Sequence, residues 1–149
     1  MKRFPAKLHK WVKNGYTLQG NQLVKLTDMK IPKEKKYKSL PAKINLKPLS
    51  VNEAWKGRRF KTEKYQEYRE NLLNLLPKIK LPAPPYKMFF EWGFSSTLSD
   101  YDNAIKNTQD IICEKYKIND KMIFHGEQIK KIVPKGKEYF IFNLTTLHA

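Results

Sequence analysis

Cysteine is nearly absent from this sequence: Cys113 is the only one among 149 residues, and there are three histidines. An intramolecular disulfide is therefore excluded, and so few thiol and imidazole groups leave no spacing typical of a structural zinc site. Long apolar runs are also missing, because no stretch approaches the roughly 18 apolar residues of a membrane span. We expect a protein with no signal peptide and no membrane segment, located in a reducing cytoplasm.

Acidic residues are scarce relative to basic ones. Thirty Lys and Arg stand against 14 Asp and Glu, which gives a formal net charge of +16. The excess is densest in residues 1–40, which carry eleven basic and two acidic side chains. A surface field of this sign attracts polyanions, so the expected partner is nucleic acid or an anionic membrane surface. The length and the 40% hydrophobic content indicate one domain with a modest core.

The N-terminal region differs in composition from the rest of the chain. Residues 30–38 combine a proline with several lysines and little to bury, which is typical of a linker or arm. Residues 16–26 predict a short hairpin about a Gly20-Asn21 turn. We therefore predict a basic N-terminal extension over residues 1–40 and a folded domain over residues 41–149.

Strand and helix patterns alternate from residue 41 onward. Thr62 is a suitable N-cap for a helix that ends at Pro77, and apolar residues recur along it at three- and four-residue spacing. A second helix is predicted from about Asp102 to Tyr116, and residues 49–59 are predicted as a loop. Strands are predicted over residues 43–47, 87–94, 128–133 and 138–144. The predicted fold class is α+β, with a small mixed sheet packed by two helices.

Acidic side chains gather at one point of this basic chain. Asp100 and Asp102 flank a single residue where the 87–94 strand meets the second helix, so they could share a hard cation. Lys106 follows one helical turn later, Asp110 one turn after that, and Asp120 comes just past the helix, where it could return to the same edge.

This combination suits phosphodiester hydrolysis. A divalent cation held by Asp100, Asp102 and Asp120 would lower the pKa of a bound water and neutralise phosphate charge. Lys106 would then contact the scissile phosphate. Mg²⁺ suits an all-oxygen site of this kind, and Mn²⁺ should substitute for it.

The same residues also have a purely structural interpretation. Asp100 or Asp102 is a natural helix N-cap. Lys106 can form ordinary helical pairs with Asp102 and Asp110, and Asn119-Asp120 is common turn chemistry. From the residues alone, both interpretations stay open.

The run Asp100-Tyr101-Asp102-Asn103-Ala104-Ile105-Lys106, followed by Ile118-Asn119-Asp120, resembles the D-x-D-N-x-x-K…D signature of the RusA family of Holliday-junction resolvases. The resemblance covers roughly residues 41–145. It implies a RusA-like fold in which Asp100, Asp102 and Asp120 bind the catalytic metal and Lys106 is required for cleavage. It also implies a bacterial or phage origin. The family commonly has two adjacent aspartates after the helix, whereas Asn119 precedes Asp120 here.

A basic cluster follows the loop that resembles the early strand–turn segment of this family. We predict that these residues contact DNA backbone phosphates, with Asn52 reaching a junction arm or a base. The alternative is a solvated basic surface at the start of a helix. The predicted DNA-binding residues are Asn52, Lys56, Arg58, Arg59 and Lys61.

The sequence and the resemblance together predict a Mg²⁺-dependent endonuclease that cuts branched DNA, foremost Holliday junctions, without a small-molecule cofactor. Symmetric cleavage of a four-way junction needs two sites related by a two-fold axis, so we expect a homodimer. One alternative is a non-catalytic nucleic-acid-binding protein whose aspartates only cap and pair. Another is a nuclease with the same metal chemistry that acts on RNA.

Overall fold

The computed structural model describes residues 16–19, 22–25, 36–57 and 60–148. The chain divides into two compact units, Met1–Lys35 and Lys36–Ala149. In the first unit, β1 (Tyr16–Gln19) pairs antiparallel with β2 (Gln22–Lys25). This pairing confirms the predicted hairpin, although its Gly20-Asn21 turn lies outside the described residues. Most of the predicted linker over residues 30–38 lies outside them as well.

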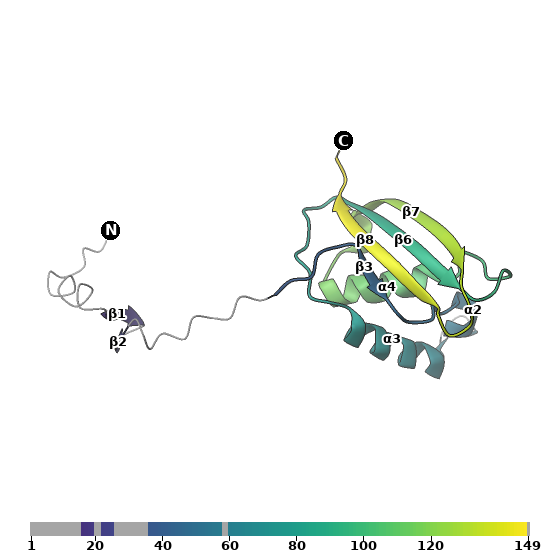
Figure 1. The fold of residues 1–149 in the computed structure, drawn as a ribbon, viewed down its shortest axis with the longest axis horizontal. Coiled ribbons are helices and arrows are strands. Elements are labelled where there is room, and N and C mark those ends of the chain that lie inside the picture. The colour runs from purple at the N-terminus through teal and green to yellow at the C-terminus, as the bar shows by residue number, and fades with distance from the viewer. Residues whose placement is uncertain (1–15, 20–21, 26–35, 58–59, 149) are drawn as a thin grey trace. The chain divides into compact units, whose positions relative to one another are not determined.

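A four-stranded mixed sheet forms the centre of the second unit, in the order β3-β8-β6-β7 (Figure 1). The central strand β6 pairs antiparallel with β8 and parallel with β7. This arrangement confirms the predicted fold class, a small mixed sheet with helices. The strands are β3 (Ala42–Ile44), β6 (Tyr86–Phe94), β7 (Ile123–Ile132) and β8 (Tyr139–Thr146).

Two helices, α3 (Glu63–Leu75) and α4 (Ile105–Tyr116), lie on the same face of this sheet (Figure 1). Side chains of β6 alternate between the two faces, and those toward the helices are buried. They join one hydrophobic core with the helices, in which the largest fully buried apolar side chains are Trp92, Phe140, Phe142, Leu72, Met88, Ile111 and Ile112.

The first of these helices begins as predicted and the second does not. The Thr62 side chain accepts a hydrogen bond from the Tyr65 N–H, which confirms Thr62 as the N-cap of α3. Helix α4 begins at Ile105, so the predicted start at Asp102 is wrong. Its N-cap is Ala104, without a side-chain cap, so neither Asp100 nor Asp102 caps it.

Residues 49–59 were predicted as a loop, and this prediction is wrong for most of them. Helix α2 (Val51–Ala54) makes one turn there, capped by Ser50, whose hydroxyl accepts from the Asn52 N–H. It leads directly into β4 (Trp55–Lys56), which pairs antiparallel with β5 (Phe60–Lys61). A helix of one turn and two strands of two residues each are too short to produce a periodic pattern in the sequence.

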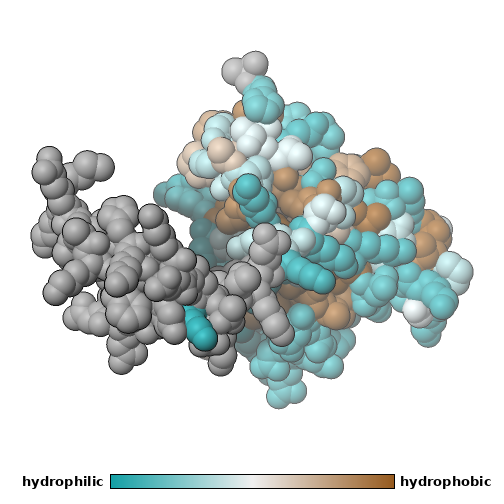
Figure 2. Space-filling model, turned by 60° about the vertical axis from the view of Figure 1, so that its left-hand side comes forward, coloured by the Kyte–Doolittle hydropathy of each residue, from teal (hydrophilic) through white to brown (hydrophobic). Residues whose placement is uncertain are grey.

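The sheet face opposite the helices carries charged side chains between apolar ones. Lys87 pairs with Glu127 at 2.7 Å, Lys131 pairs with Glu91 at 3.0 Å, and the Tyr139 hydroxyl donates to Glu91 at 2.6 Å. On the side drawn in Figure 2, hydrophobic residues likewise reach the surface between hydrophilic ones. In the described part of the chain, no helix is long and apolar enough to cross a membrane.

Candidate functional site

Asp100 and Asp102 lie in an exposed turn between the end of β6 and the start of α4. The Asn103 side chain donates a hydrogen bond from Nδ2 to Oδ2 of Asp100 at 3.2 Å. The Asp102 carbonyl accepts from the Ile105 N–H at 3.2 Å, which closes the turn onto the helix. Backbone and side-chain bonds therefore hold both carboxylates at the N-terminal end of α4.

One hydrogen bond attaches α2 to this turn, and a second attaches the residue before its cap to α4. The Val51 N–H donates to the Asn103 carbonyl at 2.7 Å, and Asn107 donates from Nδ2 to the Leu49 carbonyl at 3.2 Å. Asn107 is only 2% exposed, so this second bond satisfies a buried amide. The two bonds fix Asn52 and the acidic turn within one local structure.

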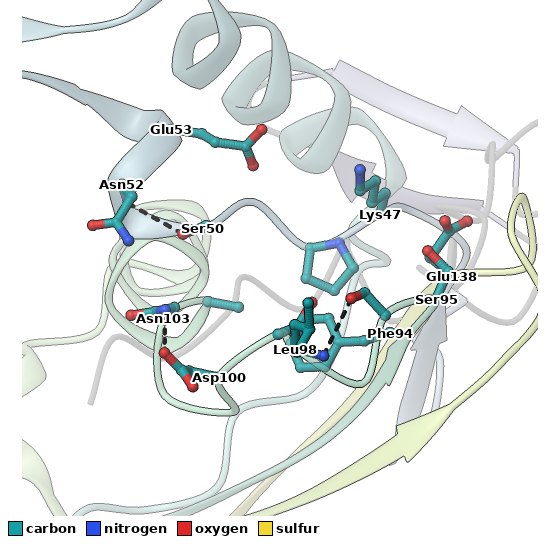
Figure 3. A pocket seen from close by; sticks show the side chains of 14 residues that line it. Lys47, Ser50, Asn52, Glu53, Phe94, Ser95, Leu98, Asp100, Asn103 and Glu138 are labelled. Carbon is teal, nitrogen blue, oxygen red and sulfur yellow. Dashed lines mark hydrogen bonds between the residues drawn. The ribbon is translucent and has the colours of Figure 1, made fainter.

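Asp100 lines a cleft of about 350 Å³ between α2, the 95–104 segment and the turn that precedes β8 (Figure 3). Asn52 also lines it, so the structure brings together one predicted metal ligand and one predicted DNA-binding residue. Two carboxylates that the sequence analysis did not single out, Glu53 and Glu138, face the same cleft. A hydrogen bond from Ser95 and the nearby charge of Lys47 hold the pKa of Glu138 below its usual value.

Lys106 lies on the first turn of α4 and forms an ion pair with Asp110 at 2.7 Å. The hydrogen bond to Asp110, with further attraction from Asp120, raises the pKa of Lys106 above its usual value. Lys106 is therefore a firmly protonated cation, and most of its side chain is exposed. The predicted pairing of Lys106 with Asp110 is confirmed.

Asp120 begins a short 3₁₀ helix, η2 (Asp120–Met122), that precedes β7. It shares a surface hollow with Asp110 and Cys113, whereas Asp100 lines the cleft beside α2. The reason is the parallel pairing of β6 with β7: α4 returns the chain to the edge where both strands begin, while Asp100 and Asp102 follow the end of β6. Among the described residues, no three His, Cys, Asp or Glu side chains form a group that could hold a metal ion.

Three of the predicted DNA-binding residues are described, and they lie on or beside the β4–β5 hairpin: Asn52, Lys56 and Lys61. Lys56 and Lys61 are exposed on its two strands, and Lys61 Nζ lies 3.9 Å from the centroid of the Tyr65 ring. Two aromatic side chains accompany them, Trp55 at 37% and Phe60 at 70% exposure. The hairpin therefore presents cations and aromatic rings together. Arg58 and Arg59 lie outside the described residues.

Two residues that support the acidic turn were missed by the sequence analysis. Lys130 on β7 donates from Nζ to the carbonyl of Thr97 at 2.9 Å and also to that of Ser99, which ties the 95–99 loop to the sheet. Asn103 bonds Asp100 through its side chain and Val51 through its backbone. The position of Asn103, a polar residue directly after two turn aspartates, is the signal that could have identified it. Lys130 had no comparable signal, because its partners are distant in the sequence.

The site thus combines exposed carboxylates, a protonated lysine and a basic aromatic hairpin. The oxygen donors of Asp100, Asp102 and Asp120 match the chemistry that Mg²⁺ prefers. No protein-family model matches the sequence, and neither does any curated protein.

Proposed function

We propose that this protein is a Mg²⁺-dependent, structure-selective endodeoxyribonuclease that resolves Holliday junctions and other branched DNA in recombination and repair. The substrate is double-stranded DNA with a branch, and the active form is a homodimer. The proposed location is the reducing cytoplasm of a bacterium, which the single cysteine fits. The proposed origin of the gene is the bacterium itself or a phage.

One observation supports the proposal most strongly: α2 connects the acidic turn to the basic hairpin. Its first residue, Val51, bonds to Asn103, and its last residue, Ala54, is followed directly by Trp55 of β4. Carboxylates alone would repel a phosphate. Placed one short helix away from Lys56 and Lys61 in a chain of net charge +16, they can act on a polyanion that the basic side chains hold.

The chain's own residues have separate tasks in this proposal. Asp100 and Asp102 would hold Mg²⁺, for which Mn²⁺ substitutes, in the turn before α4. Asp120 lines a separate hollow, so it can be the third ligand only if assembly of the dimer brings it to that turn. When bound, the metal supplies an activated water and neutralises charge on the phosphate. Asn103 orients Asp100 through its side-chain hydrogen bond. Lys106, kept protonated by Asp110, stabilises the charge that develops on the scissile phosphate.

The direct test is cleavage of a labelled synthetic four-way junction by the purified full chain. We expect nicks near the crossover with Mg²⁺ or Mn²⁺, and none with EDTA or on a linear duplex of one arm's sequence. Asp102→Asn should retain junction binding and reduce the cleavage rate at least ~100-fold, because it removes a charge needed only at the reacting phosphate.

Glu67→Gln is a matched control, because it removes one negative charge from an exposed position on α3. It should cleave as wild type does. A wild-type protein that binds junctions and never cuts them with either metal would contradict the nuclease proposal.

The second candidate is a non-catalytic nucleic-acid-binding protein. It is favoured by the ion pair of Lys106 with Asp110, an ordinary contact four residues apart on a helix, and by the separate hollows of Asp100 and Asp120. In that case Asp102→Asn would leave every measured property unchanged, with or without metal. An RNA nuclease would instead cut a four-way RNA junction in preference to the DNA junction.

A further inference from the structure

Strand β7 forms one edge of the four-stranded sheet. It is ten residues long, and β6 pairs with it along nearly its whole length on one side. In the described part of the chain, no strand pairs with its outer side. A long edge with free N–H and C=O groups is a template for another strand, and natural proteins normally protect such edges.

The side chains of β7 are also unusually open. Ile129 is 48% exposed, Ile132 51% and Phe124 65%, so three large apolar side chains lie uncovered on one strand. Phe124 falls where the pairing with β6 shifts register, between Tyr86 and Lys87, and this irregularity marks the start of the strand. The stretch from Gly126 to Ile132 is regular and can accept a partner strand.

We propose that β7 is the interface of a homodimer, in which it pairs antiparallel with β7 of a second copy, with Ile129 opposite the partner's Ile129. In this register Glu127 lies opposite Lys131 of the partner subunit, and Lys131 lies opposite Glu127 of the partner subunit. The sheet then continues through both copies. Two ion pairs flank one apolar pair at the two-fold axis.

Charge complementarity selects this register among those that a two-fold axis allows. Centring the pairing on Glu127, Lys130 or Lys131 would place like charges opposite each other, which destabilises a strand pair. Centring it on Gln128 would place Ile129 opposite a carboxylate. A half-step shift that pairs Glu127 with Lys130 is excluded, because these residues lie on opposite faces of β7 and opposed residues of two paired strands project to the same face. Of the registers compared, only the one centred on Ile129 places Glu127 and Lys131 opposite side chains of the other sign and Ile129 opposite another apolar side chain.

The existing ion pairs of this face are compatible with the interface. Glu127 contacts Lys87 and His125, and Lys131 contacts Glu91. A second copy would extend these contacts into an alternating row of charges across the sheet. The proposal specifies the interface of the homodimer expected under the proposed function, but it concerns assembly alone, so its test does not depend on cleavage.

The first test measures the molecular mass of the full chain by sedimentation over a range of concentrations. Wild type should form a dimer, and Ile129→Lys should raise its dissociation constant at least ~10-fold. Leu75→Lys is the matched control: it adds the same charge at 49% exposure on α3 and should leave the dimer intact. Far-UV circular dichroism checks that each variant is folded. A wild type that stays monomeric throughout, or a dimer that Ile129→Lys leaves unchanged, would overturn the proposal.

The second test addresses the register. Glu127→Lys alone and Lys131→Glu alone should each weaken self-association, because each places like charges across the axis. An equal mixture of the two variants should associate again, because both cross-axis pairs are then opposite in sign. Failure of the mixture to associate more tightly than either variant alone would overturn the register.

The third test is covalent. Residues opposite each other at the axis of an antiparallel pair have Cα atoms about 4.5 to 5.5 Å apart, within the range of a disulfide. Ile129→Cys should therefore form an intersubunit disulfide under mild oxidation, whereas Leu75→Cys should not. The native Cys113 is buried and should not interfere. Equal cross-linking of both variants would contradict the proposed axis.

Discussion

Tyr68 of α3 and Thr108 of α4 share a hydrogen bond of 2.8 Å inside the core. Thr108 is fully buried and Tyr68 is 5% exposed, so this polar contact joins the two helices where water does not reach. Burial raises the pKa of the Tyr68 phenol above its usual range. The bond therefore joins two neutral groups, and it fixes how α4, which carries Lys106, packs against α3.

A double-mutant cycle should measure this contact. Tyr68→Phe leaves the Thr108 hydroxyl buried without that partner and should lower the free energy of unfolding by about 1–3 kcal/mol. Thr108→Val should act similarly. The double variant should lose less than the sum of the two, because no orphaned hydroxyl remains. Urea unfolding provides the values, and additive effects would show that the two hydroxyls do not interact.

Gly93 on β6 leaves room for the ring of Tyr139 on β8. A Cβ at Gly93 would lie 2.5 Å from the ring, so Gly93→Ala should displace Tyr139 from its hydrogen bond with Glu91. We expect a loss of about 1–3 kcal/mol in urea unfolding. Gly126→Ala is the control, because its Cβ would meet no atom within 4 Å. Adding Tyr139→Ser to Gly93→Ala removes the ring that the new Cβ would meet. This should remove most of the difference in the free energy of unfolding between Gly93→Ala and Gly126→Ala.

Stability should fall in alkaline solution. Burial raises the pKa of the Cys113 thiol to about 11 and that of the Tyr116 phenol to about 12. The unfolded chain releases these protons earlier than the folded chain does. The contribution of these two groups to the free energy of unfolding should therefore be constant below about pH 8.5. It should decrease as the pH rises through 11 to 12.

Urea unfolding at a series of pH values measures this decrease. Cys113→Ala should flatten it between about pH 8.5 and 11, whatever its effect at neutral pH. The native thiol should also react with a thiol reagent at pH 8 much more slowly than the thiol of the urea-unfolded chain. Equal rates would show that Cys113 is accessible.

Lys106 should matter more for turnover than for affinity. Under the proposed function, Lys106→Ala should lower the cleavage rate of a bound junction by roughly 10²- to 10³-fold and change the dissociation constant little. Lys115→Ala is the matched control on the same helix, and it should cleave normally. An effect of Lys106→Ala on affinity alone would make this lysine a phosphate contact rather than a catalytic residue.

DNA binding by the hairpin should depend on salt. Each of Lys56→Ala and Lys61→Ala should reduce the slope of log affinity against log salt concentration by about 1, because each removes one phosphate contact. Lys80→Ala is the control: it is exposed beyond the opposite end of α3 and should leave the slope unchanged. Equal slopes for all three variants would place the DNA-binding surface elsewhere.

The sequence predicted an element correctly where its capping residue and the spacing of its buried residues indicated the same helix. In α3, the Thr62 cap and the spacing of Tyr65, Tyr68 and Leu72 all indicate the same helix, and all three apolar positions are buried. The prediction failed at the start of α4, where hydrogen bonds within the 100–104 turn delay the helix by three residues beyond the predicted Asp102. A turn of this kind has no periodicity that could be detected in advance.

The candidate site was predictable in composition but not in arrangement. The positions of Asp100 and Asp102 between strand and helix follow from the local pattern. The position of Asp120 depends on the direction of the next strand. The strand–helix–strand order favours a parallel crossover, which places Asp120 where β6 begins rather than where it ends, and the expectation that Asp120 returns to the edge of Asp100 did not take this into account. The Lys130 contact depends on the same pairing, since Lys130 lies opposite Trp92 in the parallel register.

Helices α3 and α4 cover only one face of the sheet, and this bears on how a dimer would meet its substrate. Antiparallel pairing of β7 in the register proposed above implies a two-fold axis perpendicular to the sheet. Both helical layers, and with them both turns that carry Asp100 and Asp102, would then lie on the same side of the assembly. An opened, planar four-way junction could rest on that side and reach both turns at once, so its two opposing strands could be cut without the DNA wrapping around the protein.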